Sequence, residues 1–341
     1  MTFADVLKTL TARFEGSGFA QRPPRYPGVA VEIAPDRVTA VHVTADRKSK
    51  ALTIRAVESR ELPEGAIDPS ITRPNILAPE PIRAALREIL SRIGAGEQRI
   101  SVLIPDHVAR VALLSFASLP RTRRELTEIV RFRMAKSLPF KPEEAALDLA
   151  ILPGHGGGPG PAGASILSVF IHRAVLEQYE ALFAGAGYWP GLVGLSTFEL
   201  YNLFRKHLEA ALLPDRDSLF LNVTGHYQSL LIFRGDELIF YRCKPHPEET
   251  EGALAGLRRE IYTSLAFYQE KLLGRGVGRV FLRSTGMSVE PLREAVRSEA
   301  GCEAEVLDLL KIVPLAGRMK LDPEDAARAA PAVGAVVGRR A

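Results

Sequence analysis

Glu32 and Asn222 are the residues best placed for chemistry, because each is the one polar residue in an apolar strand of a predicted hairpin. The hairpins span residues 29–43 and 219–233 and are rich in β-branched and other apolar residues around a tight turn. The first begins near the start of the chain, whereas the second begins in its other half. A hairpin repeated so far along the chain predicts two related lobes that face one cleft.

This doubled plan resembles that of the actin-like nucleotide-binding proteins. The resemblance implies that the hairpins wrap phosphates and that an acidic residue in each hairpin holds magnesium-bound water. That superfamily has Asp where Glu32 and Asn222 stand, so neither expected Asp is present. Glu32 can take this role with a longer side chain, whereas the amide of Asn222 brings no charge to magnesium.

The turns of the expected cleft have also lost phosphate-binding groups. Pro35 in the first turn has no amide hydrogen to donate, and the third turn, which the resemblance places along the adenosine, keeps a single glycine. Hydrolysis is therefore not expected. We predict a degenerate nucleotide cleft, with ATP and magnesium absent or weakly bound, formed by Glu32, Asn222, Thr224, Gly225, Ser284 and Gly286.

No other motif points to catalysis or to a metal site. The glycines at 274–278 precede a predicted strand, whereas a dinucleotide fingerprint follows a strand and opens a helix. The glycine-rich tract at 154–164 lacks the Gly-Lys-Ser/Thr ending of a phosphate loop, so we expect a mobile hairpin loop. Cys243 and Cys302 have neither metal-ligand nor disulfide spacing. We predict no catalytic residue and no metal ligand.

The composition is that of a soluble protein with two domains: 341 residues, 46% hydrophobic and 25% charged. A net charge of +4 and a pI near 9.1 favour an anionic partner, such as phospholipid, nucleotide or acidic peptide. No apolar run reaches the roughly 18 residues of a membrane-spanning helix. The first residues also lack the apolar core of an export signal, so we expect a cytoplasmic protein.

Proline, glycine and hydrophobic periodicity divide the chain into five parts. Residues 1–27 are an amphipathic helix (2–14) with a tether, and this helix either packs on the body or contacts a membrane surface or a partner. The others are a first-lobe core (28–107), an inserted α+β subdomain (108–187), a first-lobe helix (188–214) and a second lobe (215–341).

The inserted part has the order strand, helix, strand, strand, helix, at 108–116, 121–137, 145–152, 165–172 and 174–186. Its first helix carries six cations, so it either binds nucleic acid or acidic lipid or is a solvated face, and we favour the solvated face. We expect no nucleic-acid partner. The core candidates of this helix are Leu126, Ile129, Val130, Phe132 and Met134.

At this helix the sequence is similar to the PilM family of type IV pilus assembly proteins. The run that carries the similarity is Leu119-Pro120, Glu125-Leu126, Val130, Ala135, Leu138-Pro139-Phe140 and Leu147-Asp148, and the end at 331–339 is similar to the family's closing helix. The resemblance implies an α/β, actin-like two-lobe fold with an inserted subdomain like that of the division protein FtsA. Residues 242–248 leave little room for the second-lobe small subdomain, which we expect to be reduced.

The resemblance further implies a cytoplasmic protein under the inner membrane that captures the tail of a bitopic partner, PilN. We therefore predict a non-enzymatic scaffold that is peripheral on the inner membrane and can form oligomers. The candidate partner-binding residues are Val108, Val111, Phe132, Leu138 and Phe140, and we expect about half of them to be core. The alternatives are an active Mg-ATP-binding ATPase and the related cytoplasmic adaptor of type II secretion.

Overall fold

The structure of the chain is a computed structural model. It describes residues 27–337 apart from 47, 48, 50, 95, 97, 153–162 and 247–249. The predicted helix at 2–14 and most of the tract at 154–164 lie outside the described residues. The chain divides into two compact units, one made of 1–203, 313–319 and 331–341, the other of 204–312 and 320–330.

The first unit contains a five-stranded sheet with the order β3-β2-β1-β4-β8. Its strands are β1 (Val29–Ala34), β2 (Arg37–Ala45), β3 (Leu52–Glu61), β4 (Arg99–Ile104) and β8 (Trp189–Leu195). The first three pair antiparallel, while β1, β4 and β8 run parallel. The predicted first hairpin is confirmed as β1 and β2.

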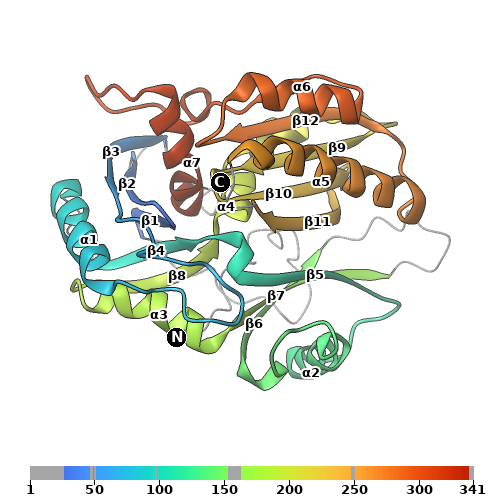
Figure 1. The fold of residues 1–341 in the computed structure, drawn as a ribbon, viewed down its shortest axis with the longest axis horizontal. Helices are drawn as coiled ribbons and strands as arrows, with labels where there is room; N and C mark the ends of the chain where they lie inside the picture. The colour runs from blue at the N-terminus through green and yellow to red at the C-terminus, as the bar shows by residue number, and fades with distance from the viewer. Residues whose placement is uncertain are drawn as a thin grey trace. The chain divides into compact units, whose positions relative to one another are not determined.

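The second unit repeats this plan, with the strand order β11-β10-β9-β12-β13 (Figure 1). The strands are β9 (Asp217–Val223), β10 (Tyr227–Arg234), β11 (Glu237–Pro245), β12 (Val277–Ser284) and β13 (Ala304–Val306). Again the first three are antiparallel and the last two add in parallel. The hairpin repeat in the sequence therefore corresponds to a repeat of the whole sheet.

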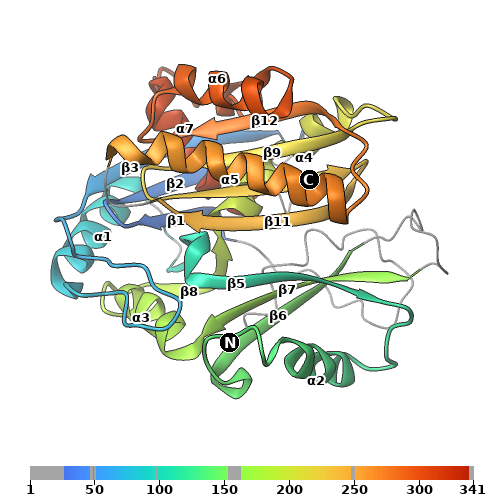
Figure 2. The ribbon, with the colours of Figure 1, turned by 45° about the vertical axis from the view of Figure 1, so that its right-hand side comes forward.

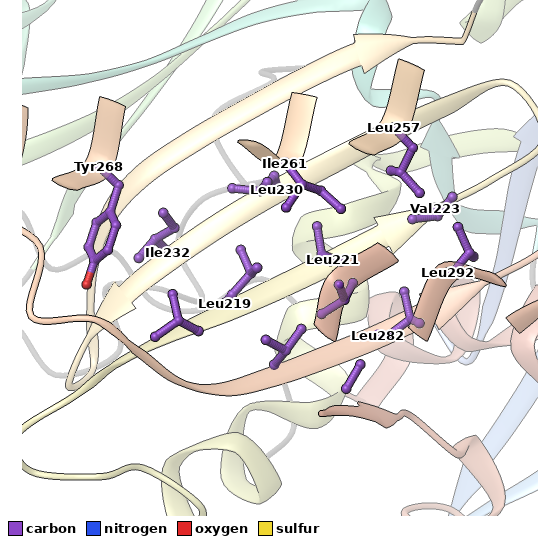
Figure 3. Close-up of a cluster of buried hydrophobic side chains, with 14 residues drawn as sticks. Leu219, Leu221, Val223, Leu230, Ile232, Leu257, Ile261, Tyr268, Leu282 and Leu292 are labelled. Carbon is purple, nitrogen blue, oxygen red and sulfur yellow. The ribbon is translucent and has the colours of Figure 1, made fainter. Parts of the chain in front are cut away.

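Helices cover one face of each sheet. In the first unit these are α1 (Pro79–Ile93) and α3 (Arg173–Ala184), and in the second α5 (Thr250–Lys271) and α6 (Val289–Ala300). Figure 3 shows how Leu257, Ile261 and Tyr268 of α5 and Leu292 of α6 meet apolar side chains of the second sheet. This combination of buried strand residues with a helical apolar stripe gives each unit its own core.

A third sheet, with the order β5-β7-β6, is inserted between β4 and β8. It consists of β5 (Ala109–Phe116), β6 (Ala145–Leu152) and β7 (Ala164–His172), and α2 (Arg123–Met134) packs on one of its faces (Figure 2). Thr122 begins α2 as its N-cap by accepting a 3.2 Å hydrogen bond from the amide of Glu125. The helix ends at Met134, earlier than the predicted residue 137, and a turn follows in which the amide of Leu138 donates to the carbonyl of Met134 over 3.1 Å.

Two helices are shared between the compact units: α4 (Ser196–Ala210) and α7 (Pro323–Val337). In the first unit the end of α7 lies against the start of α4, where a Cβ atom on Gly334 would collide with the backbone carbonyl of Glu199. The segment 313–319 also joins the first unit, through a β-bridge between Ile54 and Leu315. The sequence alone places all residues after 215 in the second lobe, and these long-range contacts explain the difference.

Three further details differ from the sequence prediction or sharpen it. The strand β8 is not predicted, because Pro190, Gly191 and Gly194 lower the strand propensity of its sequence. Residues Asp106–Val108 form a 3₁₀ turn, so β5 begins one residue later than expected. Only four residues separate the end of β11 at Pro245 from the start of α5 at Thr250, so the second-lobe small subdomain is reduced, as predicted.

Candidate functional site

Five of the six predicted cleft residues lie together in the second unit. Asn222 lies near the end of β9, and Thr224 and Gly225 belong to the turn that follows it. Ser284 and Gly286 are at the end of the neighbouring strand β12, which pairs with β9 in parallel. A Cβ atom on Gly286 would lie 3.1 Å from the amide nitrogen of Gly225. The two glycine turns are therefore side by side.

Asn222 is fully buried and is hydrogen-bonded to a cation. The Nη1 of Arg283 donates to its Oδ1 over 2.9 Å, and the Nε of Arg283 donates to the carbonyl of Ala327 over 3.0 Å. Only 3% of Arg283 is exposed. A guanidinium at this distance occupies a lone pair of the amide oxygen and repels Mg²⁺. The amide oxygen of Asn222 is thus engaged by a buried cation of the chain itself.

The hydroxyls of Thr224 and Ser284 serve their own turns. Thr224 accepts hydrogen bonds from the amides of His226 and Tyr227, over 3.1 and 3.0 Å. Ser284 donates to the carbonyl of Met287 over 2.8 Å. These bonds are the local turn-forming kind that Ser and Thr make with nearby backbone. Both hydroxyls are engaged without a ligand.

The amide of Gly286 has an internal acceptor. Gly286 has a φ of +72°, a conformation that glycine adopts easily, and its N–H donates to the Oε1 of Glu324 over 3.2 Å. Glu324 lies in the first turn of α7 and is also paired with Arg328 over 3.0 Å. A carboxylate of the chain therefore occupies a turn amide that could otherwise bind a phosphate oxygen.

A histidine lies beside the second turn. The amide of His246 donates to the carbonyl of His226 over 2.8 Å. Burial lowers the pKa of His246, against the opposing effect of a hydrogen bond to the Thr224 backbone, and nearby His226 lowers it further. His246 is therefore held in the neutral form over more of the acidic range than an ordinary histidine.

Glu32 lies in the first unit, on β1. It is buried and pairs in register with Thr39 of β2 and Leu103 of β4. The strand that carries it has the same place in the first sheet as β9 has in the second. The structure thus places Glu32 and Asn222 on equivalent strands of two equivalent sheets.

The five predicted partner-binding residues do not form one surface. Val108 is fully buried in the 3₁₀ turn, and Leu138 belongs to the core under α2. Phe140 packs partly against the same core and stacks edge-on with His172 at 5.1 Å. Val111 and Phe132 remain accessible. They lie on opposite sides of the inserted unit, which consists of the sheet β5-β7-β6 and α2. Ala112, Leu114 and Phe116 of β5 face α2, so Val111 faces away from it.

The outer face of α2 corrects a prediction. Leu126, Val130 and Met134 are buried as expected. Ile129 and Phe132, which the sequence also places in the core, are exposed by 39% and 83%. The reason is that the core takes only every fourth position, which forms a narrow stripe on one side of the helix.

Sequence reasoning missed Arg283 and Glu324. Arg283 directly follows the apolar run at 280–282 in a buried strand, and a charged residue in that place is a usable signal. Glu324 gave no local signal, because it lies 38 positions beyond Gly286 in the sequence.

Two further features of the described residues bear on function. No helix in this part of the chain is long and apolar enough to span a membrane. No cluster of three or more His, Cys, Asp or Glu side chains in the same part could hold a metal ion.

Comparisons with known proteins place the fold. No protein-family model matches the chain, and no curated protein matches its sequence. A chain of the PilM-PilN type IV pilus biogenesis complex superimposes with a TM-score of 0.74 and 18% identity, covering 93% of this chain and 98% of that one. A protein of unknown function with an actin-like ATPase fold, from Bacteroides thetaiotaomicron, superimposes with a TM-score of 0.48 and 10% identity. This match covers 82% of this chain and 90% of that one.

A further match is the cytoplasmic domain of EpsL, an inner-membrane component of the type II secretion system of Vibrio cholerae. It gives a TM-score of 0.46 and 10% identity, covering 90% of this chain and 94% of that one. At 18% identity, the match to the chain of the PilM-PilN complex shows the fold alone. The chain has the actin-like two-lobe fold with an inserted subdomain, the same fold as the matched chain of the PilM-PilN complex.

Proposed function

We propose that the chain is a non-enzymatic scaffold of type IV pilus or related secretion machinery, on the cytoplasmic side of the inner membrane. In this role it binds the cytoplasmic tail of a PilN-like membrane protein. The observation that carries the proposal is the fold match to a chain of the PilM-PilN complex, which extends over 93% of this chain. The matched region is long enough to include the inserted sheet as well as both lobes.

The strand β5 is the place on the inserted sheet that best suits an extended tail. In the order β5-β7-β6, β5 is an edge strand with one sheet neighbour among the described residues. An edge strand can accept a peptide as an added strand, with main-chain hydrogen bonds giving affinity. Val111 and Leu113, which face away from α2 and are half-buried, supply apolar contacts on that side.

Capture from membranes tests this proposal. Tagged full-length chain should retain a single-span membrane protein with a cytoplasmic tail, and a peptide of that tail should bind in calorimetry. We expect Val111→Asp to weaken peptide binding by about tenfold or more, since it places a charge in an apolar contact.

Tyr262→Ser is the matched control, because Tyr262 is an exposed aromatic residue of α5 and lies outside the inserted sheet. Thermal unfolding of both variants separates lost binding from lost folding. The proposal fails if no such membrane protein is retained, or if Val111→Asp binds the peptide as tightly as the unaltered chain.

The nucleotide cleft in this proposal is degenerate. Support comes from the cation on Asn222 and from the Glu324 carboxylate at the amide of Gly286. We expect Mg-ATP to show no saturable binding below about 1 mM in calorimetry, which corresponds to a binding free energy no stronger than about −4 kcal/mol. Tight, magnesium-dependent binding that Glu32→Ala abolishes would contradict the degenerate cleft and favour the alternative, an active ATPase.

A further inference from the structure

Positive charge is concentrated around α2. Of the 44 Lys and Arg residues in the chain, seven lie in the segment 121–141, together with two of the 40 Asp and Glu residues. This short segment therefore carries a net charge of +5, while the rest of the chain carries a net charge of −1. Such an asymmetry makes one surface of an otherwise neutral molecule attractive to anions.

Two of these arginines form interactions within the inserted unit. Arg123 is paired with the buried carboxylate of Asp148 over 2.9 Å. Arg131 donates to the backbone carbonyls of Pro142 and Ala145, and burial, reinforced by nearby Arg173, lowers its pKa. These two arginines tie α2 to the strand β6 and the turn before it. They are structural and do not contribute to a docking surface.

The remaining charge lies beside exposed apolar side chains. Ile129, Phe132, Arg133 and Lys136 follow the i, i+3, i+4, i+7 spacing that places residues on one side of a helix, and Lys136 lies in the turn that continues α2. Phe132 is 83% exposed, the highest value among the large apolar residues in the described ranges. Lys136 is exposed, and none of the ion pairs found among the described residues includes it.

Arg133 is held in place but keeps its charge at the surface. Its Nη1 donates to the carbonyl of Ser115 over 2.9 Å, and its guanidinium lies 4.7 Å from the centre of the Phe116 ring. Neither contact neutralises the cation, because a carbonyl and an aromatic ring carry no net charge. The residue as a whole stays exposed. Arg133 is thus a positioned cation on the same side as Phe132.

The stripe formed by Ile129, Phe132, Arg133 and Lys136 does not belong to the hydrophobic core. The buried side of α2 is already filled by Leu126, Val130 and Met134 against the inserted sheet, so Phe132 points outward from a helix that is otherwise packed. A protruding aromatic ring flanked by cations suits a surface that it can enter, with fixed negative charge around the point of entry. An anionic phospholipid bilayer has both properties.

We propose that the stripe Ile129, Phe132, Arg133 and Lys136 docks on an anionic phospholipid surface. The ring of Phe132 enters the headgroup region, and Arg133 and Lys136 lie over phosphate groups. Four side chains give weak, reversible attachment, because one cation near the surface contributes only about 1 kcal/mol. The contact therefore orients the inserted unit on a membrane and does not anchor the chain permanently.

Vesicle sedimentation tests the proposal with the full-length chain. Vesicles of phosphatidylcholine with about 30% phosphatidylglycerol should pellet the chain, pure phosphatidylcholine vesicles should not, and raising the salt from about 0.05 M to about 0.5 M should reverse the binding. We expect Phe132→Ser and Lys136→Glu each to lower the partition coefficient by about fivefold or more. Tyr262→Ser is the matched control, since Tyr262 is an aromatic residue of α5 that is 65% exposed.

Three results would overturn the proposal. One is equal pelleting by neutral and anionic vesicles. Another is anionic binding that Phe132→Ser and Lys136→Glu leave unchanged, which would assign the binding to another part of the chain. In the third, Phe132→Ser abolishes self-association or capture of a soluble acidic protein while vesicles are not bound, and the stripe is a protein interface. The tail-binding proposal is tested by Val111→Asp, so either proposal can fail alone.

Discussion

At the scale of single residues, the pair formed by Asn222 and Arg283 gives a direct test of the second hairpin. The amide oxygen of Asn222 faces a buried guanidinium at 2.9 Å. Asn222→Asp would place a carboxylate there without changing shape. The cation would hold the pKa of the new carboxyl low, so the variant gains about 1 kcal/mol of unfolding free energy above about pH 4 and loses it as the pH falls further. Urea unfolding across pH 3–7 measures this.

Mg-ATP binding supplies the second readout for the same variant. Because the new carboxylate is neutralised by Arg283, we expect no gain in Mg-ATP affinity. A variant that binds Mg-ATP tightly would show that Arg283 is easily displaced.

Asn75 organises the loop between β3 and α1. It is fully buried, its side-chain amide donates to the carbonyls of Ser70 and Arg73, and its oxygen accepts from the amide of Ser70 and from the hydroxyl of Tyr179. Burial raises the pKa of this tyrosine, so it remains a donor. We expect Asn75→Ala to lower the unfolding free energy by about 2–3 kcal/mol, because several buried polar groups lose partners.

Arg73→Ala is the matched control for this change in chemical denaturation. Arg73 is an exposed residue of the same loop, and its ion pair with Asp68 is on the surface. Its loss should cost less than about 1 kcal/mol. Equal effects of the two substitutions would contradict a special role for Asn75.

His246 gives the second unit a pH dependence with a definite sign. Its folded-state pKa is lowered, chiefly by burial, so the unfolded chain binds the proton more readily. The contribution of His246 to stability is complete above its ordinary pKa of about 6.5 and is lost as the pH falls below that value. His246→Gln should flatten the profile of unfolding free energy on the acidic side of about pH 6.5, which urea unfolding at several pH values measures. An unchanged profile would contradict the burial of this imidazole.

At the scale of elements, α2 has one side that is buried and stabilises the fold and another side that is exposed and available for binding. Leu126 is buried against the inserted sheet, whereas Phe132 is outside it. We expect Leu126→Ala to lower the unfolding free energy of the inserted unit by about 2–4 kcal/mol and Phe132→Ala to change it by less than about 0.5 kcal/mol. Thermal unfolding followed by circular dichroism compares the two. A large loss for Phe132→Ala would place that ring in a core.

Elements with strong periodicity were predictable, and those defined by distant neighbours were not. Both hairpins follow from local pattern and are confirmed. Strand β8 contains proline and glycines and becomes a strand because it pairs with β4. The exposure of Phe132 was also not visible locally, since only the packed sheet decides which apolar positions of α2 are covered.

At the scale of the whole molecule, the repeated hairpin was enough to predict two similar lobes, because each hairpin begins a sheet of the same order. The candidate cleft was predictable only as a list of turns. Arg283 and Glu324, which hydrogen-bond to Asn222 and Gly286 of this cleft, lie 61 and 38 positions further along the chain than these partners. Such contacts depend on tertiary packing, which local patterns do not encode.

The close approach of α4 and α7 supports a prediction for the molecule as a whole. A side chain at position 334 would collide with the backbone of Glu199, so we expect Gly334→Val to lower the melting temperature by about 10 °C or more, equivalent to roughly 3 kcal/mol. Gly96→Val is the control, because a Cβ atom at Gly96 meets open space. Similar melting temperatures for the two variants would mean that the helices can separate at little cost.

The division of the chain between its units also limits how the protein can change by recombination. The chain passes between the two units four times, at 203, 312, 319 and 330. A single crossover between related genes would therefore join segments of one unit that come from different parents. Buried residues such as Ala332 and Val333 would then pack against side chains from the other parent. We therefore expect the sequence of this protein to diverge by single substitutions, and we expect both lobes to be inherited together rather than exchanged as separate domains.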